Sequence, residues 1–152
     1  MNQAPVQKWP AQTTWLGRCD ALISSMFVAV LLRTLSLSRT FSIVQWATRL
    51  PISRRASAQQ IVADVDWALS RRRPLLRRNC LRRTLTLFLM LRRLGLPVIA
   101  HLGVIPPKGF VHSERAQALD GHAWLSLAGA VVYEPALSRV TDYTETLRLP
   151  AA

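Results

Sequence analysis

Apolar residues recur at helical spacing through the first half of the chain. The spacing predicts a helix over residues 19–35 and a second, less regular one over 39–50, which ends before a proline. Ser57, with Gln60 three residues later, forms a capping-box pattern that predicts a third helix over 57–70. The first two helices either pack plainly into a core or present an interfacial or docking surface.

The most apolar helix is predicted to begin at Cys80 and to end near Leu94, where Gly95 and then a proline stop it. Residues 85–91 are apolar nearly all round, and a helix of that kind is buried. Asn79 is a preferred N-cap residue, whose side-chain oxygen accepts the free N–H groups of the first turn. We therefore expect this helix to form the centre of the core and to hold Cys80 on a rigid support.

Beyond Pro97 the pattern changes from helix to strand. Residues 98–105 predict one strand, and residues 122–127 and 130–134 predict two more around a short turn. The tail from residue 135 is mixed, with a short helix or a strand followed by coil.

Chain length and composition limit the class of protein. The chain has 152 residues, half of them hydrophobic, which is enough for one domain with a real core. Two distant cysteines, Cys19 and Cys80, form no disulfide framework and fit a reducing compartment. The longest apolar stretch, residues 21–32, falls short of the roughly 20 residues that cross a bilayer and precedes no signal-peptide cleavage site. We expect a cytoplasmic protein without a transmembrane span.

The net charge of +12 implies an anionic partner, such as nucleic acid, an acidic peptide or a membrane surface. A solvated turn would also explain the arginines around Cys80. A surface for nucleic acid interleaves aromatic residues with the charge, and none lies between Trp67 and Phe88, so nucleic acid is not the expected partner. Four of these arginines are expected to favour the Cys80 thiolate and to attract an acidic substrate or partner: Arg77, Arg78, Arg82 and Arg83.

Cys80 has two interpretations. At a helix N-terminus the helix dipole favours the thiolate, which is the nucleophilic form; an unpaired cysteine is otherwise a small buried hydrophobe. A nucleophile needs a base and a group that orients the base. Three histidines are available, of which His101 and His112 are interpreted as bystanders.

His122 opens one predicted strand and Glu134 ends the next. A two-residue turn at Ala128 and Gly129 would put them on opposite faces of the hairpin, whereas a three-residue loop over 127–129 pairs them directly. We predict the three-residue loop, with imidazole and carboxylate in contact. The alternatives are a structural histidine and a surface acid. A metal site is not expected, because no paired ligand motif is present.

Four motifs together resemble the transglutaminase-like leader peptidases of lasso-peptide biosynthesis, over about residues 60–135. The motifs are Asn79-Cys80-Leu81-Arg82-Arg83, Arg92-Arg93-Leu94-Gly95-Leu96-Pro97, Leu102-Gly103-Val104 and Gly121-His122-Ala123-Trp124-Leu125. The resemblance implies a papain/transglutaminase-like α+β fold. N-terminal helices (1–56) would pack on a core (57–152) in which the cysteine-bearing helix lies on a small antiparallel sheet.

The same resemblance implies a bacterial cysteine protease that removes the leader from a ribosomally made precursor peptide. Cys80 would be the nucleophile, His122 the base and Glu134 the orienting acid, where the family more often has Asp. Asn79 would cap the helix at the oxyanion site, and the Cys80 N–H would supply one oxyanion donor.

No cofactor is implied. The expected partners are the precursor peptide, a separate leader-recognition protein and an ATP-dependent cyclase. Two alternatives stay open: a basic helical module that binds nucleic acid or anionic membrane, and an acyl transferase that uses the same triad.

Overall fold

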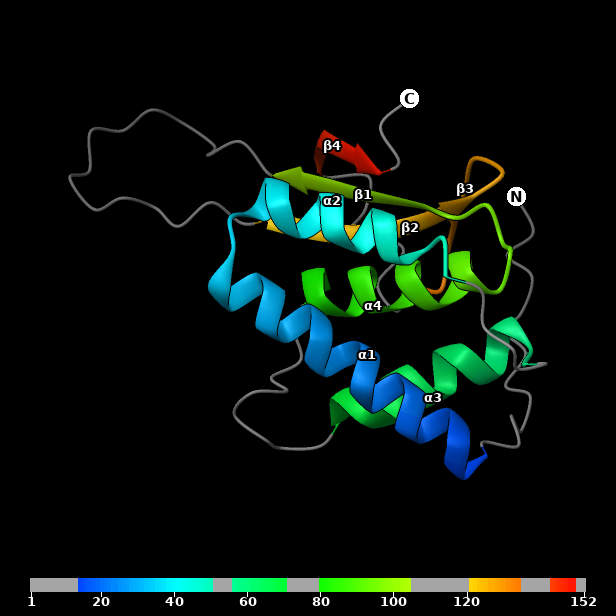
Figure 1. Ribbon diagram of the computed structural model, residues 1–152. Helices are drawn as coiled ribbons and strands as arrows, with labels where there is room; N and C mark the ends of the chain where they lie inside the picture. Colours follow the sequence, from blue (N-terminus) through cyan, green and yellow to red (C-terminus); the bar gives the residue numbers. More distant parts are fainter. Residues whose placement is uncertain (1–13, 51–55, 71–79, 105–120, 135–142, 150–152) are drawn as a thin grey trace, which may run out of the picture.

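The computed structural model describes residues 14–50, 56–70, 80–104, 121–134 and 143–149. Within them the chain forms helices first and strands afterwards (Figure 1). The helices are α1 (Trp15–Thr34), α2 (Leu37–Ala47), α3 (Ala58–Ser70) and α4 (Cys80–Arg93). The strands are β1 (Ile99–Val104), β2 (Gly121–Leu127), β3 (Ala130–Val132) and β4 (Thr144–Leu149). The predicted α+β arrangement is confirmed.

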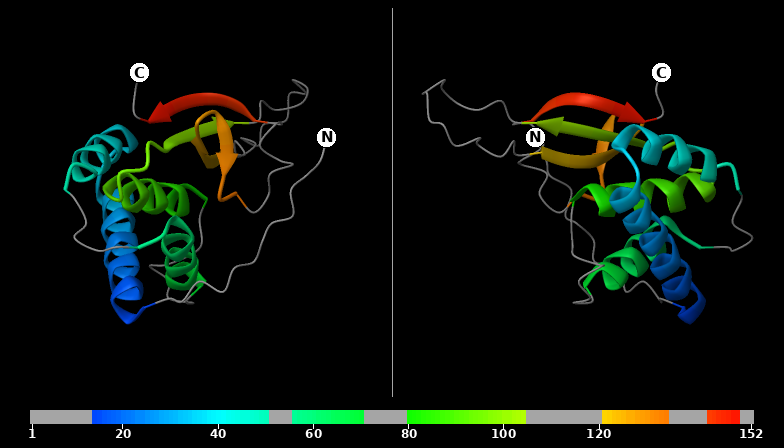
Figure 2. Two further views of the ribbon diagram at one scale, coloured as in Figure 1. Left: turned by 90° about the vertical axis from the view of Figure 1, so that its right-hand side faces the viewer. Right: turned by 60° about the vertical axis from the view of Figure 1, so that its left-hand side comes forward.

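Helix α4 is the centre of the molecule. It contacts α1, α2 and α3 as well as β1 and β2, and it lies between the sheet and the α1–α3 pair (Figures 1 and 2). Residues 82–91 of this helix are all buried, which agrees with the apolar pattern of residues 85–91 and extends the buried part to Arg82, Arg83 and Thr84. The prediction of a buried helix that begins at Cys80 is confirmed.

Local signals in the sequence set several helix ends. The capping box forms at α3: Ser57 N–H donates to Gln60 Oε1 at 2.9 Å, and Gln60 N–H donates to Ser57 Oγ at 3.2 Å. Gly95 has φ +92°, the left-handed conformation of a helix C-terminus, and Leu96 N–H closes the end on Leu91 O at 3.0 Å.

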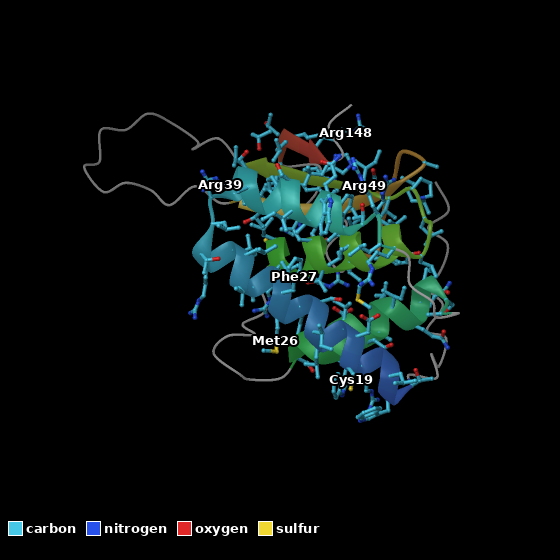
Figure 3. All side chains as sticks on the ribbon, viewed as in Figure 1. Cys19, Met26, Phe27, Arg39, Arg49 and Arg148 are labelled. Atoms are coloured by element: carbon cyan, nitrogen blue, oxygen red, sulfur yellow. The ribbon has the colours of Figure 1, made fainter. Side chains whose placement is uncertain are left out.

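Helix α1 begins four residues before the predicted start, because Thr14 caps it by accepting a hydrogen bond from Gly17 N–H at 3.2 Å. Its inward side carries mostly small residues, which allow close packing on α3 and α4: Gly17, Ala21, Ser24, Ser25, Val28 and Ala29. Large apolar side chains such as Met26 and Phe27 are exposed instead (Figure 3). The predicted apolar stripe therefore lies partly on the outer side.

By length and hydropathy, α1 is long and apolar enough to cross a membrane, although 39% of that window is buried inside the fold. The sequence-based exclusion of a span counted only the uninterrupted apolar run of residues 21–32, which is shorter than the helix. A cytoplasmic location stays a prediction, and so does the division of the chain at residue 56.

The sheet is antiparallel, with the strand order β3-β2-β1-β4. The last strand, β4, lies in the tail that the sequence left undecided. In the β2–β3 hairpin Leu127 pairs with Ala130, so the turn has two residues, Ala128 (φ 50°) and Gly129 (φ 82°). The predicted three-residue loop is wrong. Two positive φ angles match the twist of adjacent strands better than the looser loop does.

Candidate active site

Cys80 is the first residue of α4, which lies beneath the start of β2 in Figure 1. Its thiol is partly exposed and lies 3.8 Å from the carbonyl oxygen of Gly121. Asn79, Arg77 and Arg78 lie outside the described residues. The Cys80 thiol therefore lies at the N-terminal end of α4 and beside the start of β2.

A pocket of about 670 Å³ opens at this point, and both Cys80 and His122 line it. The rest of its lining comes from α2, α4, β1, β2 and β4, and it is largely apolar: Leu37, Leu81, Leu102, Gly103, Val104, Gly121, Ala123 and Thr146. Among the described residues no hydrogen bond joins the Cys80 thiol to the His122 imidazole. Contacts of this type are often long until a substrate is bound.

His122 has a carboxylate partner. Its Nε2 atom lies 3.4 Å from Oε1 of Glu134, within ion-pair distance but off the line of a hydrogen bond. The Glu134 side chain is 8% exposed and that of His122 is 16% exposed. The imidazole packs beside Trp124 and Tyr143, with ring centroids 6.3 and 5.1 Å away. These neighbours hold the ring in one orientation at the pocket wall.

The contact between His122 and Glu134 forms for a reason that the sequence did not predict. Continuing the β2–β3 pairing, in which Leu125 faces Val132, would set Glu134 opposite Ala123 and direct it to the other face. The strand stops before that point, and Tyr133 adopts φ 57°. This left-handed residue breaks the alternation of side chains, so Glu134 turns back toward His122. The predicted contact is present, although the predicted register is wrong.

Two of the arginines expected to face a substrate or partner are buried instead. Arg82 is 5% exposed and Arg83 is 7% exposed, because both lie on the inner first turn of α4. Desolvation by burial lowers the pKa of Arg82 below its ordinary value. Within the described residues, exposed basic charge lies elsewhere: at Arg33 in the last turn of α1, and at Arg39 and Arg49 by the two ends of α2 and Arg148 on β4 (Figure 3). The expected surface role is therefore wrong for Arg82 and Arg83.

A comparison with known protein families matches residues 22–148 to the transglutaminase-like superfamily. This chain belongs to that superfamily. The match covers most of the chain and includes Cys80, His122 and Glu134. Comparisons with the curated proteins and with the solved structures gave no match.

Transglutaminase-like domains are typically cysteine-dependent enzymes, of protease or acyltransferase type. A partly exposed cysteine at the start of a buried helix, in one pocket with a histidine, is the arrangement that such chemistry needs. Membership confirms the predicted fold and the family level of the resemblance.

The structure also contains a histidine network that the sequence analysis missed. His101 Nε2 lies 2.7 Å from Ser126 Oγ, and its Nδ1 lies 3.0 Å from Oε2 of Glu145. The ring stacks on Trp124, with centroids 5.5 Å apart and planes 7° apart. His101 and Ser126 are both buried. The strand register brings these residues together, and Glu145 comes from β4, which the sequence did not define.

Gly103 makes room for this arrangement. A Cβ atom there would lie 2.8 Å from the Trp124 ring and 2.9 Å from the carbonyl oxygen of Thr144. Since Gly103 pairs with His122 and neighbours His101 in the sheet, Trp124 lies between the two histidines only because this position lacks a side chain. In the part of the chain that the structure describes, no group of three or more His, Cys, Asp or Glu residues could hold a metal ion.

Proposed function

We propose that the protein is a cysteine peptidase that removes the leader from a ribosomally made lasso-peptide precursor. The main support is the shared pocket of Cys80 and His122, together with the 3.4 Å contact between His122 and Glu134. Membership of a superfamily of cysteine-dependent enzymes supports the reaction type, and the four sequence motifs support the substrate class.

The first half of the reaction forms a thioester. His122 accepts the thiol proton, and the Cys80 sulfur attacks the carbonyl carbon of the last leader residue. The backbone N–H of Cys80, in the first turn of α4, donates to the oxyanion. Collapse of the tetrahedral intermediate breaks the C–N bond, and the imidazolium returns the proton to the amine of the core peptide.

The second half releases the leader. His122 removes a proton from water, the hydroxide attacks the thioester, and the C–S bond breaks to give a leader carboxylate and the Cys80 thiol. Glu134 keeps the ring oriented and stabilises its cationic form through both halves.

The pocket suits part of an extended peptide. Its volume of about 670 Å³ and its leucine, valine and alanine lining fit one or two apolar side chains next to the scissile bond. A separate leader-recognition protein would deliver the precursor, and an ATP-dependent cyclase would take the released core. Both steps would take place in the bacterial cytoplasm.

The test is cleavage of a lasso-peptide precursor by the full chain together with a leader-binding protein, and genes for both are to be sought beside the gene for this chain. Wild type and the control Cys19→Ala should release a leader with a free C-terminal carboxylate. Its mass is that of the leader's residues plus one water. Cys80→Ala should release none while it keeps the same thermal unfolding temperature. Undiminished cleavage by Cys80→Ala would disprove the assignment.

Product mass also separates the two reactions open to this superfamily. A leader joined to an added amine, in place of the free carboxylate, would identify the chain as an acyltransferase. The remaining alternative, a basic module for nucleic acid or anionic membrane, has less support because Arg82 and Arg83 do not face solvent. A steep loss of nucleic-acid affinity with salt would favour it.

A further inference from the structure

The chain turns sharply between the end of β3 and Glu134. Tyr133 adopts φ 57°, a conformation that is uncommon for residues other than glycine, asparagine and aspartate. A strained residue of this kind persists only where surrounding contacts hold it. The position of Glu134 therefore depends on whatever fixes the backbone at Tyr133.

Arg83 makes that contact. Its Nη1 donates to the carbonyl oxygen of Tyr133 at 2.7 Å, and this carbonyl belongs to the peptide that joins Tyr133 to Glu134. Its Nε and Nη2 donate to the two carboxylate oxygens of Asp66 on α3, at 2.7 and 3.0 Å. Because two parallel hydrogen bonds to one carboxylate fix the plane of a guanidinium, they also direct Nη1 toward the Tyr133 carbonyl.

We propose that Arg83 and Asp66 are positioning residues, which hold the turn at Tyr133 and so keep Glu134 against His122. The inference rests on the proposed roles of Cys80, His122 and Glu134. Arg83 lies three residues after Cys80 on α4, so a single helix carries the nucleophile at its tip and anchors the acid from its first turn. The chain of contacts runs from Asp66 on α3 through Arg83 on α4 to the end of the β2–β3 hairpin.

A purely structural ion pair would not need this geometry. The Arg83 side chain is 9% exposed but that of Asp66 is 36% exposed, and an ion pair that reaches solvent contributes little to stability alone. Here the guanidinium has a carboxylate on one side and a strained peptide next to a site residue on the other. The prediction is that losing Arg83 affects the reactivity of Cys80 more than it affects the fold.

The experiment measures the rate at which iodoacetamide alkylates Cys80 in the full chain, which needs no substrate. Cys19 in the same molecule is a partly exposed internal reference. Arg83→Met should lower the Cys80 rate by about tenfold, the scale set by losing an activating partner of a thiolate. The Cys19 rate should not change. Arg93→Met is the matched control, since Arg93 lies at the other end of α4 and donates to Leu50 O.

Two further variants separate positioning from general loosening. In a Glu134→Gln background, Arg83→Met should change the Cys80 rate by less than about twofold, because residues that act through one another are not additive. In an Arg83→Met background, Tyr133→Gly should restore most of the lost rate, since glycine adopts positive φ without strain.

Three results would overturn the inference: an unchanged Cys80 rate in Arg83→Met, a full additive loss in the Glu134→Gln background, or a rise in Cys19 reactivity that matches the loss at Cys80. If Arg83→Met does not fold, Tyr133→Val tests the same point with the ion pair intact. Valine disfavours positive φ, so it should also slow Cys80, and an unchanged rate would count against the proposal. A wild-type Cys80 no faster than Cys19 would instead overturn the proposed function, and this inference with it.

Discussion

Two histidines of the same sheet each have a glutamate partner, yet only one of them shares an open pocket with a cysteine. His101, in the middle of β1, lies 2.7 Å from Ser126 Oγ and 3.0 Å from Glu145, so its two ring nitrogens have side-chain neighbours. His122, near the start of β2, lies 3.4 Å from Glu134 and shares a pocket with Cys80. Ser126, His101 and Glu145 are thus arranged in space as a catalytic triad would be, but they form a structural network whose serine and histidine are buried.

The difference between the two sites is access. His101 and Ser126 are closed off by Trp124 and the neighbouring strands, so no substrate carbonyl can reach the hydroxyl. His122 stands where the sheet ends and α4 begins, and a pocket opens there. An acid-paired histidine therefore indicates a catalytic group only where its nucleophile faces open space. The predictions below test this contrast, from the largest expected effect to the smallest.

Replacing the two histidines should separate activity from stability. His122→Ala should lower kcat/KM for precursor cleavage by roughly 10²–10⁴-fold, the usual contribution of a general base. His101→Ala should keep most of the activity of the folded protein but reduce the free energy of unfolding. Cleavage assays and urea unfolding of both variants check this. Equal loss of activity in the two would end the distinction.

The two glutamates should differ in the same way. Glu134→Gln should lower kcat by on the order of 100-fold, because the His122 imidazole would lose its orientation, and a small misplacement of a reacting group can cost that much. Glu145→Gln should change kcat by less than about twofold, since its carboxylate is 44% exposed and exposed ion pairs contribute little. Steady-state kinetics under identical conditions compare them. A larger effect from Glu145→Gln would reverse the assignment of the acid.

Gly103→Ala should disturb both histidines through Trp124. The added methyl group would meet the Trp124 ring at 2.8 Å and backbone at 2.9 Å, so the ring or β4 must shift. We expect a loss of about 1–3 kcal/mol in the free energy of unfolding, typical of overpacking. Urea unfolding measures this loss. Gly95→Ala is the comparison, because a Cβ atom there meets no other atom within 4 Å. Its own cost comes from the φ of +92°, which is unfavourable for alanine. A stability equal to wild type would mean that Trp124 is not locked between the histidines.

Ser126→Ala should have the smallest effect. It removes one hydrogen-bond partner of His101, so a loss of about 1 kcal/mol in the free energy of unfolding is expected. Precursor cleavage should stay within about twofold of wild type, because neither Ser126 nor His101 lines the pocket of Cys80 and His122. A loss of activity comparable to that of Cys80→Ala would assign the nucleophile to the buried serine instead.

Local features of this fold were predictable from the sequence because neighbouring residues determine them. The capping box at Ser57, the helix stop at Gly95 and the start of the buried helix at Cys80 each depend on a few consecutive residues. Each of them agrees with the structure. The family resemblance extended the prediction to the fold, which local patterns alone did not define.

The features that were not predictable are pairings between distant segments. The contact of His122 with Glu134 was expected from a three-residue loop, but it forms through a two-residue turn and a left-handed Tyr133. Tyrosine gives no sequence signal for that conformation. The inward direction of Arg83 depends on Asp66, seventeen positions earlier, and charge counting placed it on the surface. The acidic neighbour of His101, Glu145, lies on a strand, β4, that the pattern did not define.

The most direct test of the central claim compares the two cysteines of the wild-type chain. The rate at which iodoacetamide modifies Cys80 at neutral pH, divided by the rate at Cys19, reports nucleophilic activation without any knowledge of the substrate. Our account predicts a ratio of about ten or more, which falls toward one in His122→Ala. A ratio near one in the wild type would contradict it.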